Sequence, residues 1–582
     1  METNKQSKIE ELFEKGILAS EEVLERSLSD TLLHRIESES DLIVLNSDYV
    51  DVIEQQTSLV DWYEVDRYRV EAEKDRNDEL YQSQLQSFRS ISLSIPTNRK
   101  SETQEYTSTI TNLESQLSSI PFTHTIENQP LQDNSDFSAE FDSNEDSDQF
   151  SLSLSQDVSN ITPSSAVTVV LSYHNIPKKY TPQDFTNFFL SRYRFLENLL
   201  RQRQELSSPS SIARVLAKRE KEEISIIGLV ENTAETKNGN LMITIEDPTG
   251  RIKAIVSKSK KDLHTTALDL VPDEVVGISG TYMDKVIFVE NITWPDIPQT
   301  HELKKGPDEE YAIFLSDVHV GSKLFLHNEF EKFLKWVNGN TGNDEQRRVA
   351  SLVKYIIIAG DLVDGIGIYP SQEEELAITN ISDQYTAFTQ LIRQIPTSKQ
   401  IIMCPGNHDV VHLAEPQPIF YQEFSKDLFN LPNVTLVTNP SIINVGKTEK
   451  FEGFDIMLYH GYSFDYYVAN VPSIRNGGGY HRSDLIMKFL LKRRHLAPAF
   501  KSTPYYPSHE EDPLLIRKIP DFLITGHIHY CSVANYKGIT MISGSCWQAK
   551  TTFQEKLGHE PEPGRVPLVN LKTREIKILR FA

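Results

Sequence analysis

Short apolar runs that end abruptly in polar residues dominate the second half of the chain, between residues 311 and 530. Five such runs occur, each four to six residues long and mostly without alternation of polar and apolar positions. Runs of this kind are typical of strands that are buried on both faces. Because stretches of helical length separate several of them, the pattern predicts an α/β domain with helices on both faces of a sheet.

The residues that follow these runs have side chains able to hold metal ions. They are Asp317 and His319, Asp361, Asn407 with His408 and Asp409, His460, and His527 with His529. We expect the five breaks to converge, because functional groups in such sheets gather where the chain leaves the carboxyl ends of strands. Glycines at 360, 406, 461 and 526 stand beside them, where the backbone must turn sharply or approach another group closely.

The mixture of oxygen and nitrogen donors indicates the class of metal. Aspartate, asparagine and histidine together suit Mn²⁺, Fe²⁺ or Zn²⁺ better than Mg²⁺ alone. A single Asp-x-His or His-x-His motif is more often a turn or a surface pair. Five motifs, each at the end of its own buried strand, are not expected by chance, so the series predicts a metal centre.

An all-β unit precedes these runs, between residues 224 and 294. Short apolar segments separated by turns, such as Asn238-Gly239 and the turn from Asp247 to Gly250, predict five strands and hence an OB-fold barrel. OB-folds that bind single strands use aromatic side chains for base stacking. The few aromatic residues of this unit, Tyr282, Phe288 and Trp294, favour docking of a protein over tight binding of DNA.

A helix is predicted to start at Thr181, with Pro182 in its first position and Asp184 completing a capping box. Its arginines and a second basic segment each allow two interpretations. Arg192, Arg194, Arg201 and Arg203 either contact phosphate or form a solvated basic face, the commoner case. Residues 477–479 (Gly-Gly-Gly) and the run from Lys492 to His495 are either a substrate-facing insertion or a flexible loop and a solvated helix end.

The first 166 residues differ in character from the rest. Apolar stripes between residues 8 and 33 predict a small helical module over residues 1–75. Within it, residues 56–63, from Gln56 to Tyr63, resemble a sliding-clamp-binding box, with ordinary amphipathic packing as the alternative. Residues 76–166 are rich in Ser, Gln, Asn, Asp and Thr and cannot bury enough apolar surface to offset their ordering entropy, which predicts a disordered linker.

Composition limits the function further. A chain of 582 residues suggests three or four domains, and the absence of a long apolar stretch or signal peptide predicts a cytoplasmic protein that does not enter membranes. Three cysteines are too few for a disulfide framework, and Cys404 is either a nucleophile or, more commonly for such positions, a buried strand residue. A net charge of −24 argues that a partner supplies most phosphate contacts if DNA is the substrate.

The motif order Asp-x-His, Gly-Asp, Gly-Asn-His-Asp, His-Gly and Gly-His-x-His resembles the calcineurin-like metallophosphoesterases over about half of the chain. The segment 360–370, following 317–322, is similar to the small exonuclease subunits of archaeal family D DNA polymerases. The chain's own pattern predicts a helical connector at 167–218. The resemblance implies an OB-fold domain, at 219–300, before a phosphoesterase domain at 301–582. The latter would be a two-sheet sandwich flanked by helices.

The resemblance also implies roles for the site residues. Two divalent ions, Mn²⁺ with Fe²⁺ or Zn²⁺ as alternatives, would share Asp361 as a bridge. One ion would be held by Asp317, His319 and His529, and the other by Asn407, His460 and His527. His408 would bind the scissile phosphate or protonate the leaving group, and Asp409 would orient His408.

The implied activity is 3′→5′ proofreading of a DNA 3′ end, in complex with a large catalytic polymerase subunit. No polymerase active site is recognisable in this sequence, so DNA synthesis would reside in that partner. Two alternatives remain. One is a non-catalytic scaffold, and the other is a stand-alone metallophosphodiesterase acting on small nucleotides.

Overall fold

The computed structural model describes residues 18–19, 44–45, 167–173, 179–507 and 511–582. The chain divides into two compact units, Met1–Phe150 and Ser151–Ala582. In the first, the described residues are β1 (Leu18–Ala19) and β2 (Val44–Leu45), which pair in parallel. The predicted helical module, the linker at 76–166 and the clamp-like segment 56–63 lie outside the described residues.

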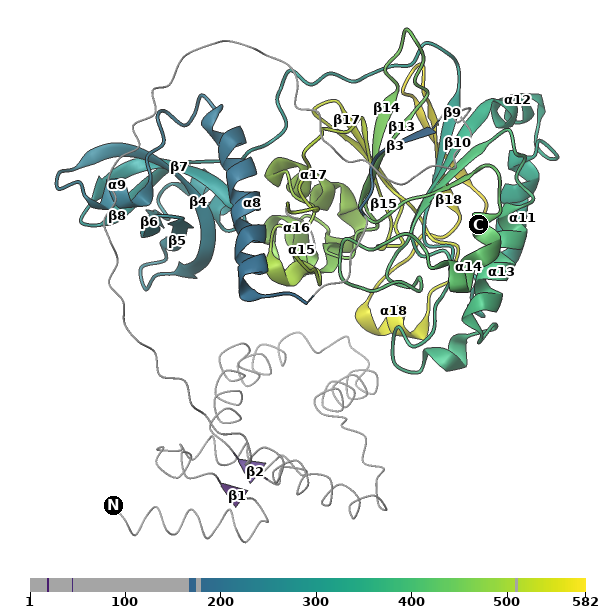
Figure 1. Cartoon of the computed structure of the whole chain (residues 1–582), viewed down its shortest axis with the longest axis horizontal. Coiled ribbons are helices and arrows are strands. Elements are labelled where there is room, and N and C mark those ends of the chain that lie inside the picture. The colour runs from purple at the N-terminus through teal and green to yellow at the C-terminus, as the bar shows by residue number, and fades with distance from the viewer. Residues whose placement is uncertain (1–17, 20–43, 46–166, 174–178, 508–510) are drawn as a thin grey trace, which may run out of the picture. The chain divides into compact units, whose positions relative to one another are not determined.

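Two six-stranded sheets form the centre of the second unit (Figure 1). The first has the order β12 (Val434–Leu436), β11 (Gln400–Cys404), β10 (Val353–Ala359), β9 (Tyr311–Leu315), β18 (Arg565–Asn570) and β19 (Ile576–Arg580). The second has the order β16 (Ser532–Tyr536), β17 (Ile539–Ser543), β15 (Phe522–Thr525), β14 (Phe454–Leu458), β13 (Ser441–Val445) and β3 (Val167–Leu171). Strands β9, β10 and β11 are mutually parallel, as are β14 and β15, so their carboxyl ends point the same way within each sheet.

The two sheets pack against each other. Phe314 of β9 and Ile357 of β10 share a buried cluster with Ile456 of β14 and Ile524 of β15. Burial of each such side chain stabilises the fold by roughly 1.5–3 kcal/mol. The neighbouring residues in the strands, such as Ile313, point to the opposite face and pack against helices.

Helices cover only the outer face of each sheet. The first sheet is covered by α11 (His327–Val337), α12 (Asp344–Leu352), α13 (Ile381–Ile392) and α14 (Gln422–Phe429). The second is covered by α15 (Phe464–Asn470), α16 (Pro472–Asn476) and α17 (Ser483–Arg493). The one sheet with helices on both faces that the apolar pattern predicts is therefore wrong, whereas the two sheets that the resemblance implies are present. A non-alternating apolar run shows that both faces are buried, but not that a second sheet buries one of them.

Five strands close into a barrel in the order β4-β5-β6-β8-β7. They are β4 (Glu222–Glu235), β5 (Leu241–Asp247), β6 (Gly250–Val256), β7 (Val275–Met283) and β8 (Val286–Thr293), with α10 (Lys261–Ala267) after β6 and α9 (Ile212–Leu216) before β4. The predicted number of strands is confirmed. The first is twice the expected length because β4 pairs with both β5 and β7. A Cβ at Gly228 would lie 2.7 Å from the carbonyl oxygen of Glu246, so this crossing needs glycine.

Helix α8 (Pro182–Arg201) begins as predicted, with the Thr181 amide donating to the Asp184 carboxylate at 2.7 Å. The segment expected to be a helical connector nevertheless starts with β3, which pairs with β13. Arg192 is fully buried, and its Nε donates to Asp512 at 2.7 Å. Neither interpretation of Arg192, as a phosphate contact or as part of a solvated face, is correct.

The basic run from Lys492 to His495 is likewise buried rather than solvated or substrate-facing. Arg493 forms an ion pair with Glu274 of the barrel at 2.7 Å, with both side chains almost fully buried. The Lys492 ammonium lies 3.7 Å from the ring centroid of Trp294. This segment thus attaches the barrel to α17. None of the helices that the structure describes is long and apolar enough to span a membrane.

Candidate metal centre

All nine residues singled out from the sequence lie in loops at the carboxyl ends of five strands. Asp317 and His319 follow β9, Asp361 follows β10, Asn407 to Asp409 follow β11, His460 follows β14, and His527 and His529 follow β15. The loops of both sheets meet at one place, so the predicted convergence is confirmed by the contacts below.

The backbone at this place is unusual. Asp317, His319, Asp361, His527 and His529 all have positive φ, between 51° and 70°. Non-glycine residues rarely adopt this conformation, and it occurs preferentially at functional sites. The flanking glycines permit close approach, because a Cβ at Gly406 would lie 2.2 Å from Asp361 Oδ1.

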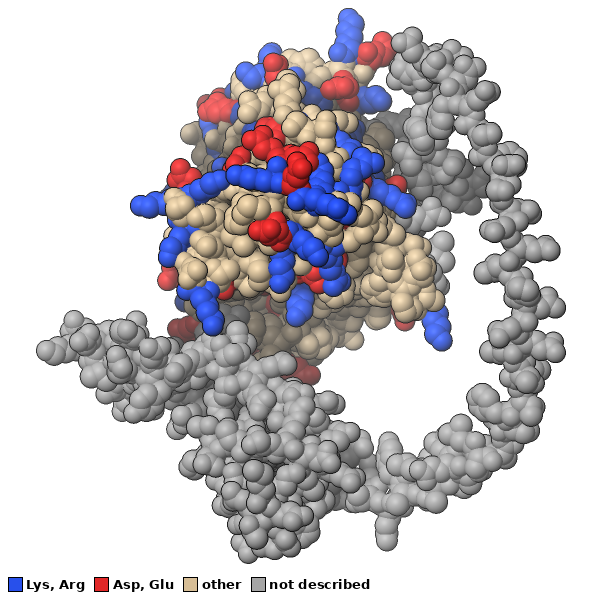
Figure 2. All heavy atoms as spheres, turned by 90° about the vertical axis from the view of Figure 1, so that its left-hand side faces the viewer, with Lys and Arg blue, Asp and Glu red and all other residues tan. Residues whose placement is uncertain are grey.

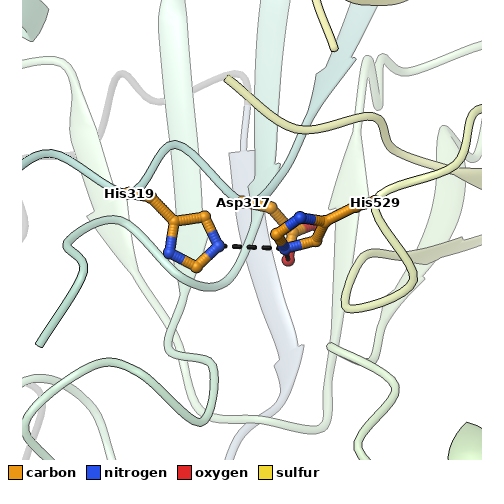
Figure 3. A group of neighbouring side chains, drawn as sticks. All are labelled: Asp317, His319 and His529. Carbon is orange, nitrogen blue, oxygen red and sulfur yellow. Dashed lines mark hydrogen bonds and ion pairs between the residues drawn. The ribbon is translucent and has the colours of Figure 1, made fainter. Parts of the chain in front are cut away.

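Asp317, His319 and His529 form one cluster, with side chains from the loop after β9 and the loop after β15 directed toward each other (Figure 3). The Nε2 atoms of His319 and His529 are 3.0 Å apart. His529 Nε2 is also 3.4 Å from Asp317 Oδ1. All three side chains are buried or nearly so, which makes this a desolvated set of donor atoms.

Asn407, His460 and His527 form a second cluster. Asn407 Oδ1 is 2.9 Å from His460 Nε2 and 3.0 Å from His527 Nδ1. Asp361 lies between the two clusters, since its Oδ2 is 3.3 Å from His460 Nε2 and 3.9 Å from His319 Nε2. One carboxylate therefore reaches both sets.

The spacing of these atoms fits metal coordination. In a shell with bonds of about 2.1 Å and angles near 90–110°, neighbouring donor atoms are roughly 3.0–3.4 Å apart. Most separations within the two clusters match this range. In the first cluster the two imidazole nitrogens face each other at 3.0 Å. This separation is expected where both nitrogens bind one cation. The residues present therefore fit two divalent ions of the Mn²⁺, Fe²⁺ or Zn²⁺ class.

Three of the four histidines direct their other ring nitrogen to an oxygen that can accept its proton, as metal-binding histidines do. These oxygens belong to the Asp364 carboxylate for His319, the Ala359 carbonyl for His460 and the Asp465 carboxylate for His527, at 2.8–3.1 Å. His529 Nδ1 instead accepts from the Gln554 side-chain amide at 2.9 Å.

None of these supporting groups was predicted from the sequence. Asp364 stands three residues after Asp361, in the same loop. Its position beside a predicted ligand was the one sequence feature that could have indicated its role. Asp465 and Gln554 lie in α15 and α18 (Thr552–Leu557), where no local pattern marks them.

His408 lies at the edge of the first cluster, its ring centroid 4.6 Å from that of His319. Its backbone amide donates to Asp361 Oδ1 at 2.8 Å. His408 Nδ1 is 2.8 Å from the carbonyl oxygen of Asp364, and a carbonyl only accepts, so Nδ1 carries the proton and Nε2 is left for a ligand.

Asp409 is placed differently from the expectation that it orients His408. Its carboxylate accepts from the amides of Gly406 and Leu362 and from the Tyr385 hydroxyl, at 2.9–3.3 Å. Asp409 thus joins the loops that carry Asp361 and Asn407, and the Asp364 carbonyl holds His408.

Burial and charge strongly perturb the titration of the centre. Burial alone would raise the pKa of Asp361, but the surrounding histidines, His460 foremost, hold it well below its ordinary value. Burial opposes charge on His460 too, yet Asp361 and Asp317 raise the pKa of His460 to about 9. Burial beside Asp361 raises the pKa of Asp409 to about 7. Protons on histidine thus balance the buried carboxylates, and divalent cations can take their place.

Comparison with known proteins gives the family of this chain. The fold and the site define a mixed α/β protein with an internal Asp/Asn/His centre suited to divalent cations. Residues 312–532 match the family model for the B subunits of DNA polymerases alpha and epsilon. The chain belongs to the family of archaeal DNA polymerase II small subunits.

Two curated relatives illustrate the extent of this match. The DNA polymerase II small subunit of Methanothermobacter thermautotrophicus is 40% identical over 399 residues, 69% of this chain and 79% of that protein. The Pyrococcus horikoshii protein of the same name is 39% identical over 402 residues, 68% of this chain but only 62% of the relative. The matched part thus spans slightly less than two thirds of the longer relative.

Proposed function

We propose that this chain is the nuclease subunit of a heteromeric archaeal replicative DNA polymerase. It would act in the cytoplasm and remove nucleotides from DNA 3′ ends, as proofreading requires. The observation that carries the proposal is the pair of donor clusters sharing Asp361, with the ring of His408 directed to their edge. Family membership adds the polymerase context.

Two domains would make up most of the second unit. Residues 301–582, with outer helices and two packed sheets to which β3 adds an edge strand, would be a metallophosphoesterase sandwich. Residues 219–300 would be an OB-fold, a class of small five-stranded barrel. The burial of Arg493 against Glu274 supports a barrel held firmly beside the phosphoesterase domain.

Two divalent ions, when bound, would supply positive charge against a phosphodiester and lower the pKa of attacking water. Asp317, His319 and His529 would hold one ion, and Asn407, His460 and His527 the other, with Asp361 shared. Mn²⁺ is the first choice, with Fe²⁺ and Zn²⁺ as alternatives.

His408 would contact the scissile phosphate or the leaving oxygen through Nε2. Burial lowers the pKa of His408, so its ring is neutral at pH 7 before substrate binds. An adjacent phosphate anion favours the charged form, which can then donate a proton to the leaving 3′ oxygen. Asp364 is the positioning residue for His408, through its carbonyl, and for His319, through its carboxylate.

The partner would be a large catalytic subunit, as the name of the relatives implies. The barrel end of the unit carries Lys and Arg side chains intermixed with Asp and Glu (Figure 2). The exposed apolar side chains of Met283 and Phe288 lie on β7 and β8 of the same barrel. Mixed charge with exposed apolar residues is more typical of a protein-docking face than of a phosphate-binding one.

The test is Mn²⁺-dependent degradation of a 5′-labelled primer with a mismatched 3′ end by the full-length chain. Asp361→Ala removes the shared carboxylate, and His408→Ala removes the phosphate-facing ring. We expect stepwise 3′ shortening by the native chain and at least about a 10²-fold loss in each variant. Arg482→Ala, an exposed residue paired with Asp484, is the control and should retain activity.

The result also separates the alternatives. Absence of shortening, both alone and with the large partner chain, would favour a non-catalytic scaffold role, which the match to polymerase B subunits allows. Activity confined to small phosphodiesters would favour a stand-alone phosphodiesterase.

A further inference from the structure

A cavity of about 330 Å³ lies beside the metal centre. The side chains that shape it include Arg475, Tyr480, His481, Tyr530, His559 and Glu560. It therefore forms between the segment around α16 and η3 (Gly479–Arg482) on one side and the loop after α18 on the other. This is the glycine-rich segment that the sequence left open as a substrate-facing insertion.

The cavity adjoins the loop that carries two of the predicted metal ligands. Ile528, which lines it, stands between the ligands His527 and His529 in the chain. Burial, together with the nearby Asp465 carboxylate, raises the pKa of the Tyr480 hydroxyl, and Asp465 Oδ2 is 3.0 Å from His527 Nε2. One carboxylate thus separates the wall of the cavity from the second metal cluster.

The lining is aromatic rather than strongly charged. The rings of Tyr480 and His559 lie with centroids 4.2 Å apart, and those of His481 and Tyr530 are 5.0 Å apart at nearly a right angle. The one guanidinium, that of Arg475, donates to the Ala469 carbonyl, and the Glu560 carboxylate disfavours a phosphate inside. Aromatic walls whose rings carry polar edge groups suit a planar, uncharged ring.

We propose that this cavity, which we call the base pocket, receives the terminal nucleobase of the strand whose phosphodiester lies at the metal centre. The inference rests on the proposed nuclease function and specifies how its substrate is held. The volume of the base pocket is at the lower end of small-ligand sites, which suits one nucleoside rather than a duplex. An unpaired 3′ end can place its base there, whereas a paired end must first separate.

Tyr480 is the principal stacking side chain of the base pocket. Gly478 and Gly479, both with positive φ, precede it, and a Cβ at Gly478 would lie 2.7 Å from the Arg482 side chain. Glycine thus permits the turn that presents the Tyr480 ring. Because every base has an aromatic face, stacking predicts binding of all four bases with little discrimination, as removal of any mismatched nucleotide requires.

The test measures binding and contact without turnover. The full-length chain carrying His408→Ala, with Mn²⁺, is titrated with two fluorescent single-stranded oligonucleotides, one ending in a normal 3′ nucleotide and one in an abasic 3′ residue. We expect the base-bearing end to bind about tenfold more tightly. Tyr480→Leu should abolish the difference, and Tyr480→Phe, which keeps the ring but loses the Asp465 contact, should retain most of it.

A second readout locates the base. An oligonucleotide with 5-iododeoxyuridine at its 3′ end is photocrosslinked to the same protein, and the attached peptide is identified by mass spectrometry. Crosslinks to Tyr480, His481 or His559 support the base pocket. Equal affinity for the two oligonucleotides, binding of neither, or crosslinks that map only elsewhere would overturn it.

These outcomes are distinguishable from failure of the proposed nuclease function. That function fails if the native chain does not shorten a primer, whereas the base pocket is judged on uncleaved DNA. Arg482→Ala, which lies outside the lining, is the matched control and should leave both affinities unchanged. Equal thermal melting temperatures would show that Tyr480→Leu folds normally.

Discussion

The Asp364 carboxylate lies 3.1 Å from Nδ1 of His319, and both side chains are fully buried. The carboxylate also accepts from Gln548 and Gln372, at 2.8 Å and 3.2 Å. The side-chain amides of two glutamines thus hold the Asp364 carboxylate, which in turn orients the imidazole of His319. This arrangement orients His319 Nε2 toward the cluster with Asp317 and makes Asp364 part of the centre without being a ligand.

Replacing Asp364 should therefore weaken metal binding while leaving every ligand in place. For Asp364→Asn we expect a roughly 10- to 100-fold lower Mn²⁺ affinity, because the neutral amide no longer orients or polarises His319. Titration followed by Mn²⁺ electron paramagnetic resonance measures this. The exposed Asp308→Asn is the control, and equal affinities of the two variants would contradict the role of Asp364.

Gly406→Ala should disable the centre by steric displacement. The new Cβ would lie 2.2 Å from Asp361 Oδ1 and 2.6 Å from the Asp361 backbone nitrogen, so the shared carboxylate must move. We expect loss of Mn²⁺ binding at both clusters. At Gly250 a Cβ would meet only Ile212, at an ordinary 3.6 Å, so Gly250→Ala should bind Mn²⁺ normally. Normal binding by Gly406→Ala would refute the argument.

Metal ions should raise the thermal stability of the protein, because the folded chain assembles both clusters and the unfolded chain does not. At a Mn²⁺ concentration about 100 times the dissociation constant, each site adds roughly 2.7 kcal/mol to the free energy of unfolding. Differential scanning fluorimetry in EDTA and in Mn²⁺ measures the shift. Asp361→Asn should lose most of it, whereas Asp262→Asn, on the barrel, should not.

Arg493→Ala should detach the barrel from α17. It leaves the Glu274 carboxylate buried without its cation, which costs roughly 3–5 kcal/mol. The indole of Trp294 donates to Glu274 at 2.9 Å, so tryptophan fluorescence during urea unfolding reports on this contact. The exposed pair of Arg482 and Asp484 is worth less than about 1 kcal/mol, so Arg482→Ala is the comparison. Equal losses would contradict the assignment.

Mild acid should destabilise the contact between α8 and residue 495. His495 Nε2 is 2.8 Å from Asp512, and its Nδ1 accepts from the Ala497 amide. Burial, aided by Arg192, lowers the pKa of His495 to about 4 from 6.5. Below pH 6.5 the unfolded chain binds a proton that the folded chain excludes, so stability present above pH 6.5 is lost as pH falls toward 4.

The expected loss from His495 is about 2 kcal/mol between pH 7 and pH 5. Urea unfolding at the two pH values measures it in the native chain and in His495→Gln. The variant has no titrating ring at this position and should show a correspondingly smaller difference. An unchanged pH dependence in the variant would show that other groups are responsible.

Several features of the fold followed from local sequence. The capping box of α8 and the five barrel strands depend on residues that are neighbours in the chain, so spacing alone predicted them. The polar breaks after β9, β10, β11, β14 and β15 were predicted because a buried apolar run can end only where the backbone leaves the sheet.

Other features depend on contacts between distant parts of the chain. The spacing of Arg192 and Arg493 is that of exposed basic residues, and only their pairing with Asp512 and Glu274, more than 200 positions away, explains their burial. The same holds for Asp465 and Gln554, whose importance arises from their positions beside His527 and His529.

The sequence by itself determined the donor groups of the centre, because five local motifs contain its donor residues and set their order. The apolar pattern alone predicts one sheet, and the tertiary structure decided that two sheets bring those motifs together. It also decided which atoms support them and that an aromatic cavity lies beside them. The reason is physical: strand and turn formation depend on nearby residues, whereas the packing of one sheet on another depends on faces that meet only in the folded chain.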